Sequence, residues 1–93
     1  MSEHPTVERE FEVQLELGLH ARPAGQFVTL ASRFESEIEV GRGGEWVSGR
    51  SVLSILSLAA AKGSRVRIRA AGPDAEAAVE SLGAVLLRTS SDA

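Results

Sequence analysis

The chain has 93 residues, of which 43 % are hydrophobic and 25 % charged, and its formal net charge is -3. This composition is typical of one globular domain and argues against nucleic acid as the main partner. The absence of cysteine excludes disulfides and thiolate metal sites. No apolar run approaches the roughly 20 residues of a membrane span, and the polar start lacks the apolar stretch of a signal peptide. We therefore expect a cytoplasmic protein without membrane insertion.

We expect one domain over residues 1–93, with an ordered core over 6–88 and loose tails at 1–5 and 90–93. Alternating hydrophobic and polar side chains predict a first strand over residues 7–16. Its buried side chains are predicted to be Phe11, Val13 and Leu15. From Ala21 the apolar spacing becomes that of a helix. The buried face of this helix is predicted to contain Ala24, Phe27, Val28, Ala31 and Phe34.

Two short strands follow, joined by a hairpin turn at the glycine pair 43–44. The first of them is predicted to bury Ile38 and Val40, and the second spans residues 45–48. Ser51 begins a short helix, and Gly63 is predicted to lie just beyond its end. The core-facing side chains of this helix are predicted to be Ile55, Leu58 and Ala59.

A fourth strand over residues 65–70 and a last helix opened by Asp74 complete the order β-α-β-β-α-β-α. The apolar face of the last helix is predicted to contain Ala75, Ala78, Val79, Leu82 and Leu86. Every strand has one apolar face, so we expect helices over one side of an open sheet.

The polar face of the sheet indicates the order of the strands. The fourth strand presents three arginines, whereas the first presents Glu10 and Glu12 and the second presents Glu37 and Glu39. Opposite charges on neighbouring strands attract by roughly 0.2–1 kcal/mol per pair. An arginine strand between two glutamate strands predicts the order 1-4-2-3. The alternative is that these charges are merely solvated.

The start of the first helix carries an unusual pair of residues, His20 at the expected N-cap and Arg22 in the first turn. Ser, Thr, Asp or Asn is the usual N-cap, and a cation near the positive end of the helix dipole typically costs about 0.3–1 kcal/mol. A bound anion would reverse that cost, because the N–H groups of Ala21 and Arg22 and the Arg22 guanidinium favour phosphate. Histidine is itself a nucleophile with a pKa near neutrality. The alternative interpretation is a histidine cap beside a surface arginine.

Residues 18–24, Gly-Leu-His-Ala-Arg-Pro-Ala, closely resemble the active-site signature of the HPr family, the histidine-containing phosphocarriers of the bacterial sugar phosphotransferase system. Residues 49–58 resemble the regulatory serine region of the same family, at the family's separation, and the element order agrees over about 7–87. The resemblance implies an α+β open-faced β-sandwich with four antiparallel strands and three helices. It also implies that Nδ1 of His20 accepts phosphate from phospho-enzyme I and passes it to a histidine of an enzyme IIA protein.

Under this resemblance the protein is a monomeric, stoichiometric phosphoryl carrier that needs no cofactor and no metal. The sequence contains no G-x-x-x-x-G-K-[ST] segment and no paired acid–base constellation. One departure from the family lies at Leu17, where many members have a small polar residue near the active histidine. A leucine cannot hydrogen-bond the imidazole or the phosphate, which puts the tuning of phosphoryl affinity in doubt.

The second helix has apolar residues on more than one side. Val52, Leu53 and Leu56 form a predicted docking patch, which the family uses for its partners. The alternative is that these side chains are buried in the core. Ser51 is a natural N-cap, and the resemblance adds its phosphorylation by an HPr kinase in some bacteria. Arg50 is either a contact for that kinase or a surface charge.

Two rival functions remain at this point. A regulatory HPr-like protein would signal by its phosphorylation state, either in the nitrogen-related branch of the family or as a corepressor that acts through phosphorylated Ser51. Relatives specialised for the serine role lack the active histidine, so His20 argues against that second version. A plain α+β interaction domain without phosphorylation would make the pair of His20 and Arg22 accidental.

Overall fold

The computed structural model describes residues 4–90. Its elements follow in the predicted order: β1 (Thr6–Glu12), α1 (Ala21–Ala31), β2 (Glu37–Arg42), β3 (Glu45–Ser48), α2 (Val52–Ser57), β4 (Arg65–Ala71) and α3 (Ala75–Leu87). The predicted loose tails fall in part on residues 1–3 and 91–93, which lie outside the described residues. For residues 4, 5 and 90 the looseness stays a prediction.

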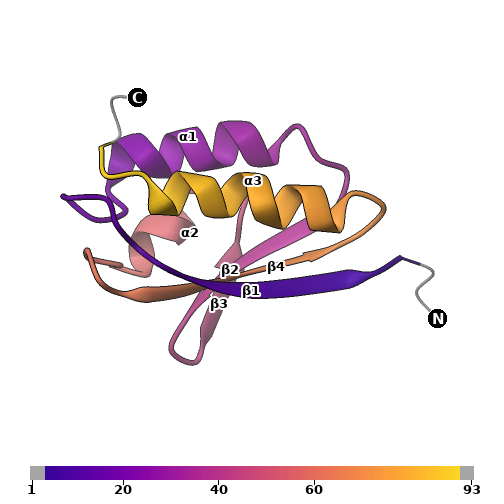
Figure 1. Ribbon diagram of the computed structural model, residues 1–93, viewed down its shortest axis with the longest axis horizontal. Helices are drawn as coiled ribbons and strands as arrows, with labels where there is room; N and C mark the ends of the chain where they lie inside the picture. The colour runs from indigo at the N-terminus through magenta and orange to yellow at the C-terminus, as the bar shows by residue number, and fades with distance from the viewer. Residues whose placement is uncertain (1–3, 91–93) are drawn as a thin grey trace.

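The four strands form one antiparallel sheet in the order β1-β4-β2-β3, which confirms the predicted order 1-4-2-3. The three helices lie over one face of this sheet, and the other face is open (Figure 1). The predicted α+β open-faced sandwich is therefore confirmed.

The core lies between the sheet and the helices because every second side chain of β4 is buried, and β2 follows the same alternation up to Val40. Val66, Ile68 and Ala70 of β4 are each fully buried. Gly83 lets α3 approach β1 closely, since a Cβ atom at this position would lie 2.2 Å from Cζ of Phe11. An alanine there would force the phenyl ring or the helix to move.

The open face carries the charge pairs from which the strand order was predicted. Arg65 lies 3.3 Å from the Glu10 carboxylate, and Arg69 lies 2.7 Å from that of Glu39. Arg67 and Arg69 also pack over the ring of Trp46, with guanidinium carbons 4.7 and 3.9 Å from its centroid. These pairs each contribute little energy, and the two ion pairs join β4 to its neighbours β1 and β2.

Two element ends differ from the predictions. β1 ends at Glu12 rather than continuing to residue 16. The Val13 N–H still donates to the carbonyl of Ser64, but the Ser64 N–H donates to Ala61 instead of returning to Val13, so the regular pairing with β4 stops there. Val13 and Leu15 are nevertheless buried, as predicted. Phe34 lies beyond the end of α1 and packs against the core from the following loop.

The predicted end of α2 at Gly63 is wrong, because α2 ends at Ser57. Ala59 stops the helix with a φ of 49°, in the left-handed region, and its N–H donates to the Leu56 carbonyl. This is a C-terminal turn of the kind that glycine usually makes. Ala59 is consequently exposed and not a core-facing residue.

Two long-range clamps hold the loop between α1 and β2. The Asp74 carboxylate does not cap its own helix and instead accepts hydrogen bonds from the backbone N–H groups of Glu35 and Ser36 and from Ser36 Oγ. From the other side, Nη2 of Arg50 donates to the carbonyls of Phe34 and Ser36, at 2.8 and 3.0 Å. The Ser36 hydroxyl and the Glu35 N–H hold the pKa of Asp74 below its ordinary value, since they favour the ionised form.

We expect Asp74→Asn to destabilise the protein at neutral pH and to reduce its sensitivity to acid. A lowered pKa in the folded state stabilises the fold above the unfolded value of ~3.9, and this contribution is lost as the pH falls through the folded value. The free energies of unfolding of wild type and variant should therefore converge below about pH 4. Urea denaturation at pH 7, 5 and 3 measures this, with Glu16→Gln, at an exposed carboxylate, as control. A difference that is constant over this range would contradict the role of Asp74.

We expect Ala59→Gly to raise the free energy of unfolding by up to about 1 kcal/mol, because glycine occupies the left-handed region without steric cost. Ala61→Gly is the matched control, since its backbone is not left-handed. That change should lower the free energy of unfolding by roughly 0.4–1 kcal/mol through the added freedom of the unfolded chain. Thermal unfolding of both variants checks the opposite signs.

Candidate functional site

His20 is the N-cap of α1, as predicted, with extended backbone at φ -83° and ψ -172°. Its carbonyl accepts the first helical hydrogen bond, from Ala24 N–H at 3.0 Å. Its side chain makes no capping hydrogen bond and is half-buried. The imidazole is therefore not used to stabilise the helix start, which removes the interpretation of His20 as an ordinary cap.

A tight loop before α1 fixes the position of His20. Gly18 has a φ of 74°, and a Cβ atom there would lie 2.8 Å from the carbonyl oxygen of Ala60. Only glycine fits this position without movement. The next residue, Leu19, is buried and donates its N–H to the same Ala60 carbonyl at 2.9 Å. The loop after α2 thus supports the loop that carries His20.

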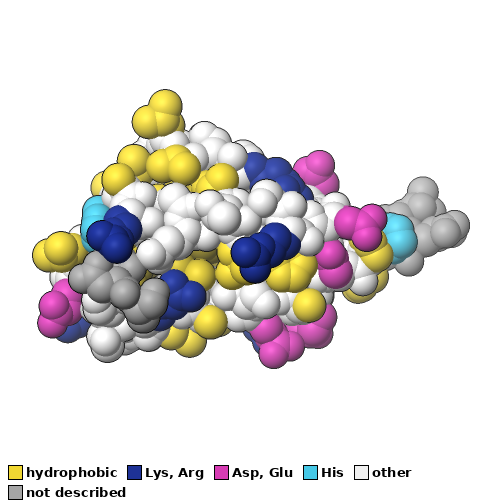
Figure 2. Space-filling view, turned by 90° about the horizontal axis from the view of Figure 1, so that it is seen from above, with side chains coloured by type: hydrophobic (Ala, Val, Ile, Leu, Met, Phe, Trp, Pro, Cys, Tyr) yellow, Lys and Arg dark blue, Asp and Glu magenta, His cyan; other side chains and the backbone are white. Residues whose placement is uncertain are grey.

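A shallow hollow of about 300 Å³ adjoins the imidazole. Its lining is mainly apolar and comes from the loop before α1, from the end of α2 and from the loop after it. The lining residues are Leu17, Leu19, His20, Leu56, Ala59, Ala60 and Ala61. Figure 2 looks onto the helical layer and shows a histidine, basic side chains and hydrophobic side chains gathered at the end where α1 begins.

The first turn of α1 supplies the groups expected to hold an anion. Ala21 and Arg22 are both exposed there, and the first turn contains no acidic residue. Pro23, the third residue of the helix, has no N–H, so the donors nearest to His20 are those of Ala21 and Arg22. The dipole of this eleven-residue helix adds to their attraction for a negative group.

The predicted docking patch is divided by the structure. Leu53 is 80 % exposed, whereas Val52 and Leu56 are partly buried and pack against the core. The alternative of deeper burial thus applies in part to these two residues. Leu56 also lines the hollow beside His20, so one member of the patch lies close to this histidine.

Sequence reasoning missed that Leu17 belongs to the apolar surface around His20. Its side chain is 80 % exposed and lines the same hollow as Leu56 and Ala59. The sequence pointed to Leu17 only as a lost polar neighbour. An available signal was its place in a turn directly before Gly18, since a leucine there has no strand or helix face to bury it.

Ser51 is the N-cap of α2, as predicted, and its Oγ accepts a hydrogen bond from Ser54 N–H at 3.2 Å. The residue is partly exposed. The neighbouring Arg50 is more than a surface charge, because its guanidinium holds the carbonyls of Phe34 and Ser36. Ser51 and the hollow beside His20 lie at opposite ends of the six-residue helix α2.

Within residues 4–90 no three histidine, cysteine or carboxylate side chains come together to bind a metal. None of the helices in this described range is long and apolar enough to span a membrane. These two findings concern only the part of the chain that the structure describes.

Comparison with known proteins identifies the family of the chain. Residues 7–87 match the family model of the phosphotransferase-system HPr component phosphorylation site. The chain is 42 % identical over 79 residues to the phosphocarrier protein HPr of Vibrio cholerae, covering 85 % of this chain and 93 % of that protein. It is also 42 % identical over 76 residues to the HPr-like protein Crh of Halalkalibacterium halodurans, covering 82 % and 90 %.

A solved structure extends the likeness to the fold. The crystal structure of a phosphocarrier protein HPr from Bacillus anthracis superposes with a TM-score of 0.84 at 41 % identity, over 87 % of this chain and 96 % of that one. The matched region includes the strand order, the three helices and the segment that places His20 at the start of α1. The chain therefore belongs to the HPr family, the phosphocarrier proteins of the phosphotransferase system.

Proposed function

We propose that His20 carries the phosphoryl group, which it receives from phospho-enzyme I and passes to a histidine of an enzyme IIA protein. The observation that supports this most directly is the His20 side chain itself. It stands at the N-terminus of an eleven-residue helix without serving as its cap, beside a first turn that contains Arg22 and no acid. A phosphate on this imidazole lies close to the donors that a helix start provides.

The transfer is an exchange of one phosphorus–nitrogen bond for another. A ring nitrogen of neutral His20 attacks the phosphorus of the donor's phosphohistidine, and the donor nitrogen leaves with its electron pair. A histidine nitrogen of the acceptor then attacks the same phosphorus, and the His20 nitrogen leaves with its electron pair, which restores His20. Because the bonds broken and formed are alike, the group passes in either direction at small cost. The first-turn N–H groups of Ala21 and Arg22 and the Arg22 guanidinium stabilise its oxygens.

Partner proteins are proposed to dock on the apolar surface next to His20. Of the large hydrophobic side chains in residues 4–90, three are exposed, and two of these are Leu17 and Leu53. Apolar side chains around a nucleophile exclude water from the transferred group and give a surface that donor and acceptor share. Under this proposal the protein is a monomeric stoichiometric carrier in the cytoplasm, and turnover belongs to its partners.

The His20 assignment is tested by incubating the protein with labelled phosphoenolpyruvate and its enzyme I. Wild type should gain one acid-labile phosphate, and His20→Ala should gain none. Arg22→Gln should slow the transfer by roughly ten- to a hundredfold, because it removes one hydrogen bond to a charged group. Arg65→Gln, an equal charge change on the open sheet face, is the control. Labelling that survives His20→Ala would show that another residue accepts the phosphate.

We further propose that phosphorylation of Ser51 by an HPr kinase regulates this exchange. Two observations favour it: Ser51 is accessible at the start of α2, and the relatives at 42 % identity include an HPr-like protein Crh. A phosphate there adds about -1.5 to -2 charge at pH 7. Since Leu53 follows two residues later and is 80 % exposed, that charge would oppose docking of an apolar or acidic partner.

Two N-cap variants separate the effect of charge from the effect on the helix. Asp and Asn both cap helices well, so Ser51→Asp and Ser51→Asn should be equally stable to within about 0.5 kcal/mol. Ser51→Asp alone should weaken binding to enzyme I, by roughly tenfold. Steady-state transfer rates at varied concentrations of the carrier measure this as a raised KM. Equal KM values for the two variants would contradict regulation by charge at this position.

A further inference from the structure

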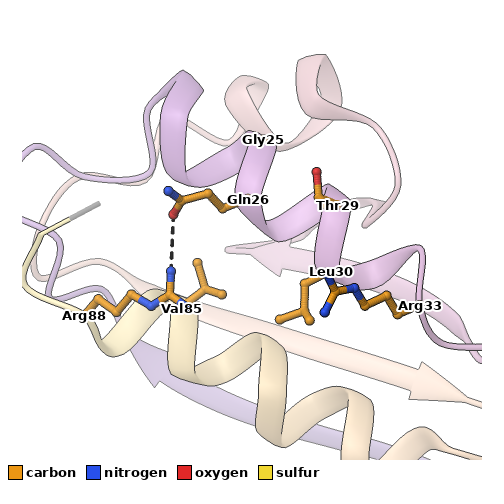
Figure 3. A pocket seen from close by; sticks show the side chains of 7 residues that line it. All are labelled: Gly25, Gln26, Thr29, Leu30, Arg33, Val85 and Arg88. Carbon is orange, nitrogen blue, oxygen red and sulfur yellow. Dashed lines mark hydrogen bonds between the residues drawn. The ribbon is translucent and has the colours of Figure 1, made fainter. Parts of the chain in front are cut away.

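A groove outside the phosphoryl site runs between α1 and α3. Its volume is about 510 Å³, and residues of both helices line it (Figure 3). Leu30 of α1 and Val85 of α3 form its apolar part, and Arg33 and Arg88 lie at its two ends. All of the lining residues are described, and none of them is acidic.

The two arginines are held apart by the antiparallel course of the helices. Arg88 directly follows the last residue of α3, Leu87, and Arg33 lies two residues beyond the last residue of α1, Ala31. Nη1 of Arg88 donates to Oε1 of Gln26 at 3.3 Å, which ties it to the opposite helix. Gln26 lies in the second turn of α1 and Arg33 just beyond its end, so the two arginines stand at opposite ends of the groove (Figure 3).

We propose that this groove binds a small organic molecule with an anionic group at each end, of the bisphosphate or phosphorylated carboxylic acid class. Charge complementarity supports this choice. The groove is lined by two arginines and no acidic residue, although the chain as a whole has a net charge of -3. Guanidinium groups bind phosphate and carboxylate with forked hydrogen bonds. The carbon chain of the molecule lies over the partly exposed Leu30, beside the almost fully buried Val85.

This site is independent of the phosphoryl carrier function. His20 and Arg22 do not line the groove. Loss of binding in the groove therefore leaves the proposed role of His20 untouched, and a failure of His20 to accept phosphate leaves the groove proposal untouched.

Alkane diphosphonates serve as molecular rulers for the test. The isotope-labelled full chain is titrated with three-, five- and seven-carbon diphosphonates, and separately with pentylphosphonate and inorganic phosphate. The changes in amide chemical shifts give the dissociation constant of each compound. We expect one of the diphosphonates to bind at least tenfold more tightly than pentylphosphonate, with shifts centred on Leu30, Arg33 and Val85. Arg33→Gln and Arg88→Gln should each weaken that binding about tenfold. Arg88→Lys should recover part of it, because the charge remains without the fork.

Arg65→Gln provides the matched control, since it removes the same charge from the open sheet face, where the Arg65 side chain is 66 % exposed. It should leave the dissociation constant within twofold of wild type, and so should His20→Ala. Equal weakening by Arg65→Gln would mean general attraction of anions and would overturn the proposal. Shifts centred on Ala21 and Arg22 would equally overturn it, because the anion would then occupy the start of α1.

Discussion

Burial of one face of β4 is the constraint on which the rest of the structure depends. This strand lies between β1 and β2, and its Val66, Ile68 and Ala70 are fully buried beneath the helices. A shift of one residue in its pairing would turn these side chains to water and bring three arginines into the core. The register of the sheet is therefore fixed by the core, and the charge pairs on the open face follow from it.

The same constraint determines where the site lies. With one face of the sheet committed to the helices, the connections before α1 and after α2 meet at one end of the helical layer. They are joined there by the Ala60 carbonyl, which accepts from Leu19 and leaves no space for a side chain at residue 18. His20 is thus held in place through the loop after α2 although it belongs to a loop itself, which suits the phosphoryl exchange proposed for it.

The sequence predicted the features that depend on local pattern or on charge sign. These include the element order, the strand order, and both N-caps, His20 and Ser51. It failed where a contact joins distant segments. Nothing local to Asp74 indicates that its carboxylate holds residues 35 and 36. The end of α2 was mispredicted for a different, local reason: Ala59 adopts the left-handed conformation that usually requires glycine. The groove between α1 and α3 likewise exists only once the helices are packed.

The contacts of Trp46 have a consequence for how this protein is observed in solution. It is the only tryptophan, and the chain has no tyrosine, so almost all near-ultraviolet absorption and emission come from one indole. That ring packs on the open face of the sheet, under Arg67 and Arg69 and against Gly41. Its fluorescence therefore reports whether the sheet is intact. A partner that docks on the helical face leaves this chromophore uncovered, so folding and docking are separable by their optical signals.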